Sequence, residues 1–98
     1  MEKRIGVIAI LLNETRNVQK LNSLLSEYGE IIIGRMGLPL RDKGIHIISL
    51  IVEGNTDQIG ALTGKIGKLE GIQVKSVLTR YKEEGDESFE ENDPKEFH

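Results

Sequence analysis

Residues 5–13 read IGVIAILLN, and residues 45–53 read IHIISLIVE. When the chain is shifted by 40 residues, these two apolar stretches lie over each other, with Ile5 on Ile45 and Ile8 on Ile48. Short apolar runs rich in isoleucine, leucine and valine are typical of buried β-strands. The pair therefore predicts two equivalent strands, at residues 5–12 and 45–52.

The segment after each of these strands repeats as well. With one extra residue at the Glu53–Gly54 turn, Val18 falls on Ile59 and Leu21 falls on Leu62. Apolar residues recur there every three or four positions, which is typical of an amphipathic helix. They are Val18, Leu21, Leu24, Leu25 and Tyr28 in the first half, and Ile59, Leu62, Ile66 and Leu69 in the second. A second apolar run follows each helix, so each half reads strand, helix, strand.

Cap and turn residues mark the helix ends. Gly29 and Gly71 follow the two helices, where a left-handed residue is favoured. Side chains that can cap the helix starts are Thr15 or Asn17 for the first helix, and Asn55 or Thr56 for the second. A tandem β-α-β, β-α-β chain of this length predicts the ferredoxin-like split βαβ fold (βαββαβ), an α+β sandwich. Its antiparallel sheet has the order 4-1-3-2, and both helices lie on one face.

This fold leaves the second face of the sheet to be explained. In the first strand the odd positions are Ile5, Val7, Ala9 and Leu11, and the even positions are Gly6, Ile8, Ile10 and Leu12. Both sets are apolar, yet two helices can cover only one of them. An antiparallel sheet with one face in water should alternate apolar and polar residues. We therefore expect another surface to cover the second face, most economically a second subunit.

Residues 30–41, EIIIGRMGLPLR, hold the strand that the predicted order places at an edge of the sheet. An apolar edge without charges invites uncontrolled pairing, so proteins usually cover or blunt it. Pro39 is expected to end the pairing of this strand. We therefore predict an interface in a homodimer or homotetramer, formed by Ile31, Ile32, Ile33, Arg35 and Met36.

Three glycines, Gly60, Gly64 and Gly67, share one stripe of the second predicted helix, away from its apolar stripe. Each glycine inside a helix costs about 1 kcal/mol relative to alanine. Two interpretations stay open. Either another backbone or a ligand approaches this stripe closely, which adds the three glycines to the predicted interface, or the helix is simply weak there.

Positive charge gathers on the hairpin between the two halves. Arg35, Arg41 and Lys43 lie within nine residues of one another, next to Gly34 and Gly37. One interpretation is an ordinary solvated hairpin. The other is a subunit contact or a corner that binds an anionic ligand, formed by these three cations.

The end of the chain differs from the rest in charge. Residues 82–98 hold two lysines and eight acidic residues, a net charge of −6, whereas residues 1–81 carry +3. A segment with so few apolar residues cannot offset the entropy of ordering. We expect one domain over residues 1–81 and an acidic disordered tail over residues 82–98. The alternative is an acidic arm folded back over the basic body.

Several classes of chemistry lack support in the sequence. There is no cysteine, hence no disulfide, thiolate nucleophile or cysteine-based metal site, which fits a reducing cytoplasm. His46 stands alone within its strand and is expected to be a packed or interface residue. No nucleophile–base spacing, phosphate-binding loop, nucleic-acid-binding motif or apolar run of ~20 residues is present. We expect no catalysis, cofactor or metal, no direct nucleic-acid binding by this chain alone, and no membrane association.

Two strings carry a resemblance to a known family. IIGRMG at residues 32–37 and ALTGKIG at residues 61–67 resemble the small bacterial family of iron-only (FeFe) hydrogenase system regulators, over about residues 3–80. That family is similar in fold to ACT domains and to the C-terminal effector domain of nickel-responsive repressors. The resemblance implies a regulatory or effector module that oligomerises.

The resemblance does not carry over the ligand sites of those relatives. Nickel-responsive repressors bind nickel through several histidines and a cysteine, but the folded body here holds only His46. ACT domains commonly hold an amino acid at an Asp-x-x-Gly turn, but the equivalent turn, residues 13–17, has no glycine. Two hypotheses follow: a regulator of hydrogenase expression or maturation that senses a small molecule or a protein, or a structural or assembly factor without a ligand.

Overall fold

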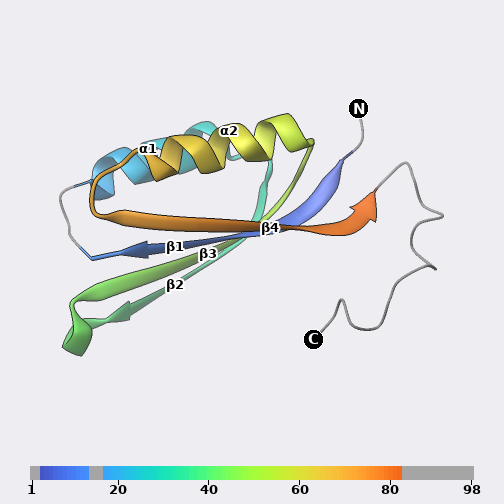
Figure 1. Cartoon of the computed structure of the whole chain (residues 1–98). Helices are drawn as coiled ribbons and strands as arrows, with labels where there is room; N and C mark the ends of the chain where they lie inside the picture. The colour runs from blue at the N-terminus through green and yellow to red at the C-terminus, as the bar shows by residue number, and fades with distance from the viewer. Residues whose placement is uncertain (1–2, 14–16, 83–98) are drawn as a thin grey trace.

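The computed structural model describes residues 3–13 and 17–82, which form two layers (Figure 1). The elements in chain order are β1 (Arg4–Leu12), α1 (Val18–Glu27), β2 (Ile32–Leu40), the short 3-10 helix η1 (Arg41–Lys43), β3 (Ile45–Gly54), α2 (Thr56–Gly67) and β4 (Ile72–Lys82). The antiparallel sheet has the order β2-β3-β1-β4, which is the predicted order read from the other edge. Both helices lie on one face of it (Figure 1). The predicted ferredoxin-like fold is confirmed.

The core lies between the sheet and the helices. It is built from even-numbered residues of β1 and β3, from the apolar stripes of both helices, and from Ile31, which directly precedes β2. Its members, all at most 5% exposed, are Ile8, Ile10, Leu12, Leu21, Leu25, Ile31, Ile48, Leu50, Val52, Ile59, Leu62 and Ile66. Burying one such side chain fully contributes about 1.5–3 kcal/mol, so this cluster is the main source of the fold's stability.

The two helices begin in different ways. Asn55 caps α2 as predicted: its side chain accepts a hydrogen bond from the backbone N–H of Gln58 at 2.7 Å, and the Gln58 side chain accepts one from the Asn55 backbone N–H at 3.0 Å. Asn17 precedes α1 but makes no side-chain cap bond. Its Nδ2 instead donates to the carbonyl oxygen of Glu70 at 2.8 Å, which ties the start of α1 to the turn after α2. Thr15, the other candidate for this cap, lies outside the described residues.

The two glycines predicted to be left-handed behave differently. Gly71 has φ 80°, as expected, but the prediction for Gly29 is wrong, because among the described residues only Gly44 and Gly71 have a positive φ. The chain leaves α1 through right-handed turns, in which Gly29 N–H donates to Ser26 and Ile31 N–H donates to Tyr28, both at 3.1 Å. A left-handed cap is therefore not needed at this helix end.

The expectation that Pro39 ends the pairing of its strand is also wrong. β2 continues through Pro39, which lies opposite His46, to Leu40, which lies opposite Ile45. Because β2 is an edge strand, one of its sides has no pairing partner in the sheet, and a residue without an N–H is tolerated there. The hairpin then closes through η1 and Gly44, whose φ is 68°.

The segment predicted to be an acidic tail, residues 82–98, lies outside the described residues except for Lys82, which ends β4. Neither described helix is long and apolar enough to cross a membrane.

Candidate functional site

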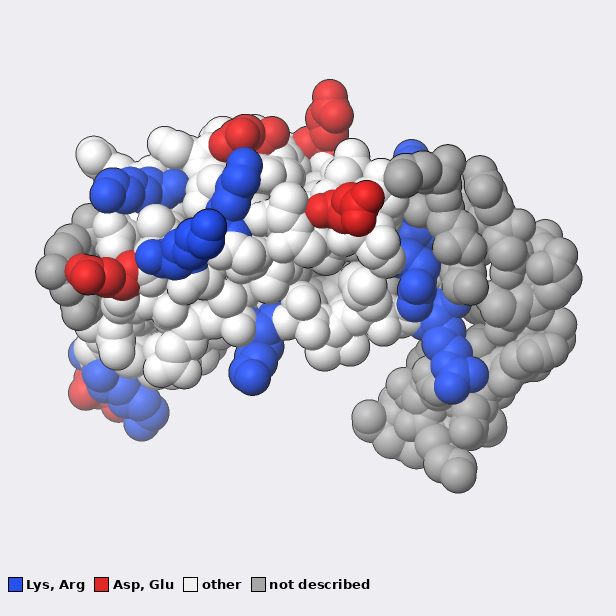
Figure 2. All heavy atoms as spheres, turned by 45° about the horizontal axis from the view of Figure 1, so that its top comes forward, with Lys and Arg blue, Asp and Glu red and all other residues white. Residues whose placement is uncertain are grey.

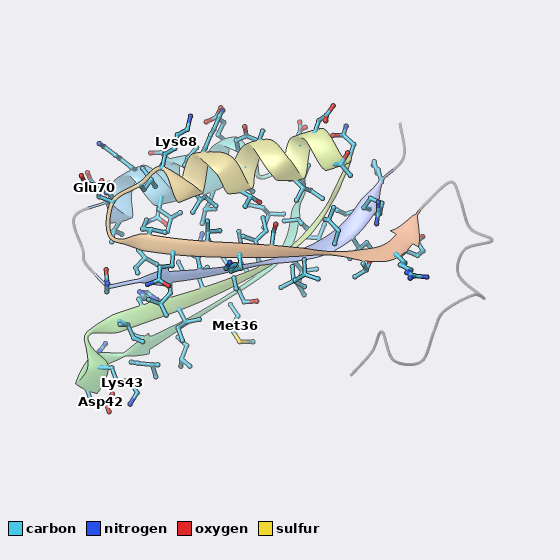
Figure 3. The ribbon with its side chains drawn as sticks, viewed as in Figure 1. Met36, Asp42, Lys43, Lys68 and Glu70 are labelled. Atoms are coloured by element: carbon cyan, nitrogen blue, oxygen red, sulfur yellow. The ribbon has the colours of Figure 1, made fainter. Side chains whose placement is uncertain are left out.

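The sheet presents a largely apolar surface on the side away from the helices, here called the open face. The strand pairing arranges its side chains in rows across the sheet. Its members are Val7, Ala9 and Leu11 on β1, Ile47, Ser49 and Ile51 on β3, Met36 and Leu38 on β2, and Gln73, Lys75 and Val77 on β4. Figure 3 shows Met36 pointing away from the helices on this side. Apolar side chains thus line both faces of the sheet, as the sequence predicted.

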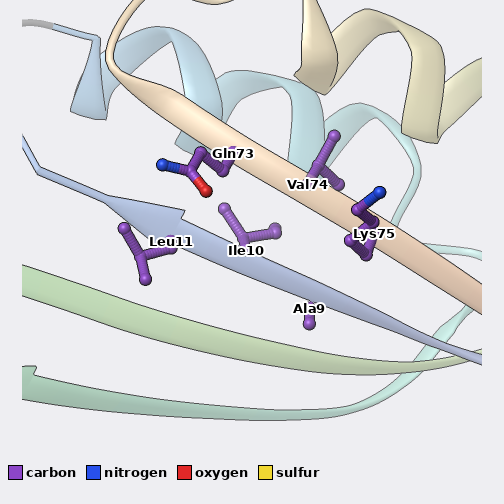
Figure 4. A pocket seen from close by; sticks show the side chains of 6 residues that line it. All are labelled: Ala9, Ile10, Leu11, Gln73, Val74 and Lys75. Atoms are coloured by element: carbon purple, nitrogen blue, oxygen red, sulfur yellow. The ribbon is translucent and has the colours of Figure 1, made fainter.

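In the middle of the open face, the side chains of the two central strands are small and protrude little from the sheet. Ala9 and Ser49 lie opposite each other in its central row. Beside Ala9, between β1 and β4, is a pocket of about 170 Å³ (Figure 4). Its lining residues are Ala9, Ile10, Leu11, Gln73, Val74 and Lys75. The open face is therefore a low apolar surface with a polar margin on β4.

The residues of β2 that were predicted to form an interface lie in different places. Ile31 is 5% exposed and belongs to the core, Ile32 packs against the core, and Ile33 is 57% exposed. Arg35 lies on the helix side, where its Nη2 donates to Asn22 Oδ1 at 3.2 Å. Of these residues, Met36 is the one that the strand pairing places within the open face.

A β-bulge produces this arrangement. Ile32 lies opposite Val52, and Gly34 lies opposite Ile51, so Ile33 is an extra residue in β2. An extra residue reverses which face each following side chain takes. Arg35 consequently turns toward α1, while the next residue along the strand turns to the open face.

The glycine stripe lies on the exposed side of α2. A Cβ added at Gly60 or Gly64 would meet no atom within 4 Å, whereas one at Gly67 would lie 3.4 Å from Val74 Cγ1. Within the described part of the chain, nothing packs closely on Gly60 or Gly64. These two glycines are therefore accessible from outside the chain, and their place in an interface stays a prediction.

The three cations proposed as an anion-binding corner do not lie together. Arg41 and Lys43 belong to η1, with Asp42 between them. Figure 3 shows Asp42 and Lys43 at the tip of the hairpin. Arg35 lies nearer the start of β2, away from the hairpin tip, where it is opposite Leu50 and beside α1. Of the three predicted cations, Arg41 and Lys43 thus share the tip of the hairpin, and Arg35 does not.

A second pocket, here called the strand-end pocket, adjoins this corner. It has a volume of about 340 Å³ and is lined by Leu12, Asn13, Val18, Pro39, Arg41, Gly44, Ile45 and His46. It forms where β1 ends and β3 begins, because His46 lies opposite both Leu12 and Pro39 in the sheet. Arg41 and His46 can both donate hydrogen bonds to an anion, while the aliphatic side chains offer an apolar wall. The volume is that of a pocket for a small metabolite.

Sequence reasoning did not connect His46 and Asn13 with this corner. The structure contradicts the prediction that His46 is packed, because it is exposed and lines the strand-end pocket, whereas its place in an interface stays a prediction. The repeat itself contained the signal. If the first strands of the two halves pair antiparallel over their full length, the end of one meets the start of the other.

The outer surface of the helices carries interspersed acidic and basic side chains (Figure 2). Lys65 of α2 lies 3.8 Å from the Glu27 carboxylate and 5.1 Å from the centre of the Tyr28 ring. A side-chain hydrogen bond with Tyr28 is the largest cause that raises the pKa of Lys65 above its ordinary value. The negative charges of ionised Tyr28 and of Glu27 raise this pKa further. Among the described residues, no three histidine, cysteine or acidic side chains gather in a way that could hold a metal ion.

Comparison with known proteins supports the resemblance seen in the sequence. A family model described as TM1266-like, with the name iron-only hydrogenase system regulator, matches residues 4–76. The chain belongs to this family. The solved structure of the uncharacterized protein TM1266 from Thermotoga maritima is 34% identical, with a TM-score of 0.76, over 80% of this chain and 99% of that one.

More distant structures share the fold of this TM1266-like chain. The ACT domain of GTP pyrophosphokinase from Chlorobium tepidum is 19% identical, with a TM-score of 0.65, over 76% of this chain and 99% of that one. A formyltetrahydrofolate deformylase from Pseudomonas putida is 10% identical, with a TM-score of 0.59, over 79% of this chain and 30% of that one. A search of curated proteins finds no match.

The family match covers both candidate surfaces. Residues 4–76 include every residue that lines the strand-end pocket and all of the open face except Val77. Residues 82–98 lie outside the match. The two surfaces therefore belong to the part of the chain that this TM1266-like family defines.

Proposed function

We propose that the chain is a non-catalytic, cytoplasmic regulatory module of the iron-only hydrogenase system, and that it binds a small anionic effector in the strand-end pocket. The regulatory role is supported by the description of the family to which residues 4–76 belong. The absence of catalysis is supported by a sequence without a nucleophile–base arrangement or a cysteine.

The observation that carries the effector is the composition of the strand-end pocket. Arg41 supplies a permanent positive charge and a planar set of donors that suits a carboxylate. His46 supplies a second donor from the facing strand. Leu12, Val18 and Ile45 would contact the apolar part of the same ligand. The effector class that fits is a small carboxylate with an apolar body, such as an amino acid or a 2-oxo acid.

Thermal shift and calorimetry with a panel of amino acids and 2-oxo acids test this proposal. A ligand that binds only the folded chain, at a concentration of about 100 times its Kd, stabilises it by ~2.7 kcal/mol, which raises the melting temperature by several degrees. Arg41→Gln should weaken binding by about 10- to 100-fold, because a charge-assisted hydrogen bond contributes about 1.5–3 kcal/mol.

Arg35→Gln is the matched control, since it makes the same chemical change at a residue that does not line the pocket. It should leave the affinity unchanged. Equal losses in both variants would mean that binding follows the overall charge instead of this pocket. If no carboxylate moves the melting temperature, the effector part of the proposal fails.

The second candidate function is a structural or assembly factor without a ligand. The observation that favours it is the open face, which offers a surface for another macromolecule and no buried polar group for a small one. A chain that ignores the whole ligand panel, yet assembles with defined stoichiometry, would support this second function.

A further inference from the structure

Exposed apolar side chains concentrate on one side of this molecule. Six large hydrophobic residues are exposed in the described part of the chain: Val7, Ile33, Met36, Leu38, Ile51 and Val77, with exposures from 40% to 71%. The strand pairing places all of them except Ile33 on the open face. Single exposed apolar residues are normal on protein surfaces, but a contiguous group on one face marks an interaction site.

The open face has the composition of a subunit interface. On the two central strands it combines Ala9, Ser49, Ile47 and Ile51, without a charged side chain, and Lys75 on β4 lies at the outer end of the row of Ala9. Lys75 on the edge strand β4 and Glu53 at the end of β3 supply opposite charges at the margin. Interfaces characteristically have an apolar centre and a polar rim.

The size of the face is sufficient for a specific contact. Four strands about 4.8 Å apart, each about nine residues long at ~3.3 Å per residue, cover about 600 Å². Two such faces in contact would bury about 1,200 Å² in total, which is the lower end of the range for specific interfaces.

The edges of the sheet are less suited to a contact. The unpaired edge of β2 is interrupted by the bulge at Ile33 and by Pro39, which has no N–H to donate. Next to β4, the pairing with β1 shifts register between Arg4 and Gly6. Bulges and prolines are features that protect an edge from pairing with another chain. Packing through the face is therefore favoured over extension of the sheet.

We propose that the open face is the interface between two copies of this chain, packed sheet against sheet about a two-fold axis. A second copy fits because the face is nearly neutral, so two identical faces meet without accumulating charge of one sign. Glu53 at the end of β3 and Lys75 on β4 give each copy one acidic and one basic side chain at the margin of the face. Residues 83–98 are a poorer occupant, because eight acidic residues would lose hydration over a face with one lysine.

Sedimentation of the full chain at micromolar concentration, without added ligand, tests the contact. The wild type should sediment as a dimer of the 11.0 kDa chain. The double variant Val7→Lys/Ile51→Lys should raise the dissociation constant of the dimer by at least about 100-fold, because each dimer would bury four unpaired charges. Both residues are already at least 40% exposed in the single chain, so the far-UV circular dichroism should be unchanged.

The control variant Ser23→Lys/Ser26→Lys adds the same charge on the exposed side of α1 and should remain a dimer. A cross-link supplies an independent readout, because the chain has no native cysteine. Ser49→Cys, at the centre of the face, should form a disulfide-linked dimer under mild oxidation, and Ser23→Cys should not.

Three results would overturn the proposal. The wild type could be a monomer at every concentration tested. The double lysine variant could stay a dimer, which would place the interface elsewhere, for example on the glycine stripe of α2. Lastly, removal of residues 83–98 could convert a monomeric wild type into a dimer, which would show that this segment covers the face instead of a second copy.

Discussion

Strand β2 holds one residue more than regular pairing with β3 requires, and this surplus permits a sharp test of the open face. Deleting Ile33 joins Ile32 directly to Gly34, and both keep their present partners on β3. The bulge disappears, but every later residue stays on its own face. Arg35 therefore remains on the helix side, beside Asn22.

Deleting Met36 removes the same bulge in another way. If the hairpin keeps its pairing from Gly37 to Leu40, Arg35 takes the place opposite Ser49 that Met36 now holds. The arginine then lies on the open face, in its central row. The two deletions thus give strands of equal length and regular pairing that differ in the face on which Arg35 lies.

The two deletions should cost the single chain similar amounts of stability. Ile33 is 57% exposed and Met36 is 71% exposed, so less than half of each residue's surface is buried in the folded single chain. Since full burial of such a side chain contributes about 1.5–3 kcal/mol, each deletion should cost about 1 kcal/mol, or a fall of about 4–8 °C in melting temperature for a domain of this size.

Their effects on the dimer should differ widely. The Met36 deletion places one arginine from each copy in an apolar interface, and we expect the dissociation constant to rise by at least about 100-fold. The Ile33 deletion should change it by less than about tenfold. Sedimentation equilibrium at matched concentrations measures both, with circular dichroism melts to confirm folding. If the Met36 deletion dimerises as well as the wild type, or the Ile33 deletion dissociates equally, the reasoning is refuted.

Gly64→Ala should stabilise the chain by about 1 kcal/mol, since a Cβ there meets no atom within 4 Å. Gly6→Ala should destabilise the chain, because its Cβ would lie 2.8 Å from a main-chain carbonyl oxygen of β4. Thermal melts measure both changes, and a destabilised Gly64→Ala would reveal a partner on α2. Asn55→Ala should cost about 1 kcal/mol in urea unfolding, and no loss would contradict the capping box seen at α2. Because Tyr28 is the main cause of the raised pKa of Lys65, Tyr28→Phe should lower that pKa in an NMR titration, and an unchanged value would show that the contact is absent in solution.

The fold was predictable because independent signals in the sequence agree. The apolar stretches of the two halves predict paired central strands, and the structure pairs β1 with β3 from Arg4 opposite Gly54 to Leu12 opposite His46. The apolar stripes of the helices fall on the buried residues Leu21, Leu25, Ile59, Leu62 and Ile66. Periodicity averages over many residues, so no single exception changes the outcome.

Details that depend on one residue were not predictable. The sequence does not show that Ile33 is a bulge, and without it Arg35 and Met36 would exchange faces. Likewise, Asn17 occupies the predicted cap position but bonds to Glu70, which is 53 residues away and was not visible as a neighbour. Local rules identify which residues can form a contact, and the tertiary structure selects among the available partners.

The predicted anion-binding corner was also wrong about Arg35, because the distance between residues depends on the secondary structure that joins them. Arg35 and Arg41 lie six residues apart, which in an α-helix would be a short separation. In a strand, six residues extend about 20 Å at ~3.3 Å per residue. Arg35 therefore cannot share a small ligand with Arg41 while β2 is extended. His46 and Leu12 are further apart in sequence than Arg35 and Arg41 are, yet they lie opposite each other in the sheet and line one pocket. A cluster of charges in an edge strand should accordingly be assigned to a site only after the strand pairing is known.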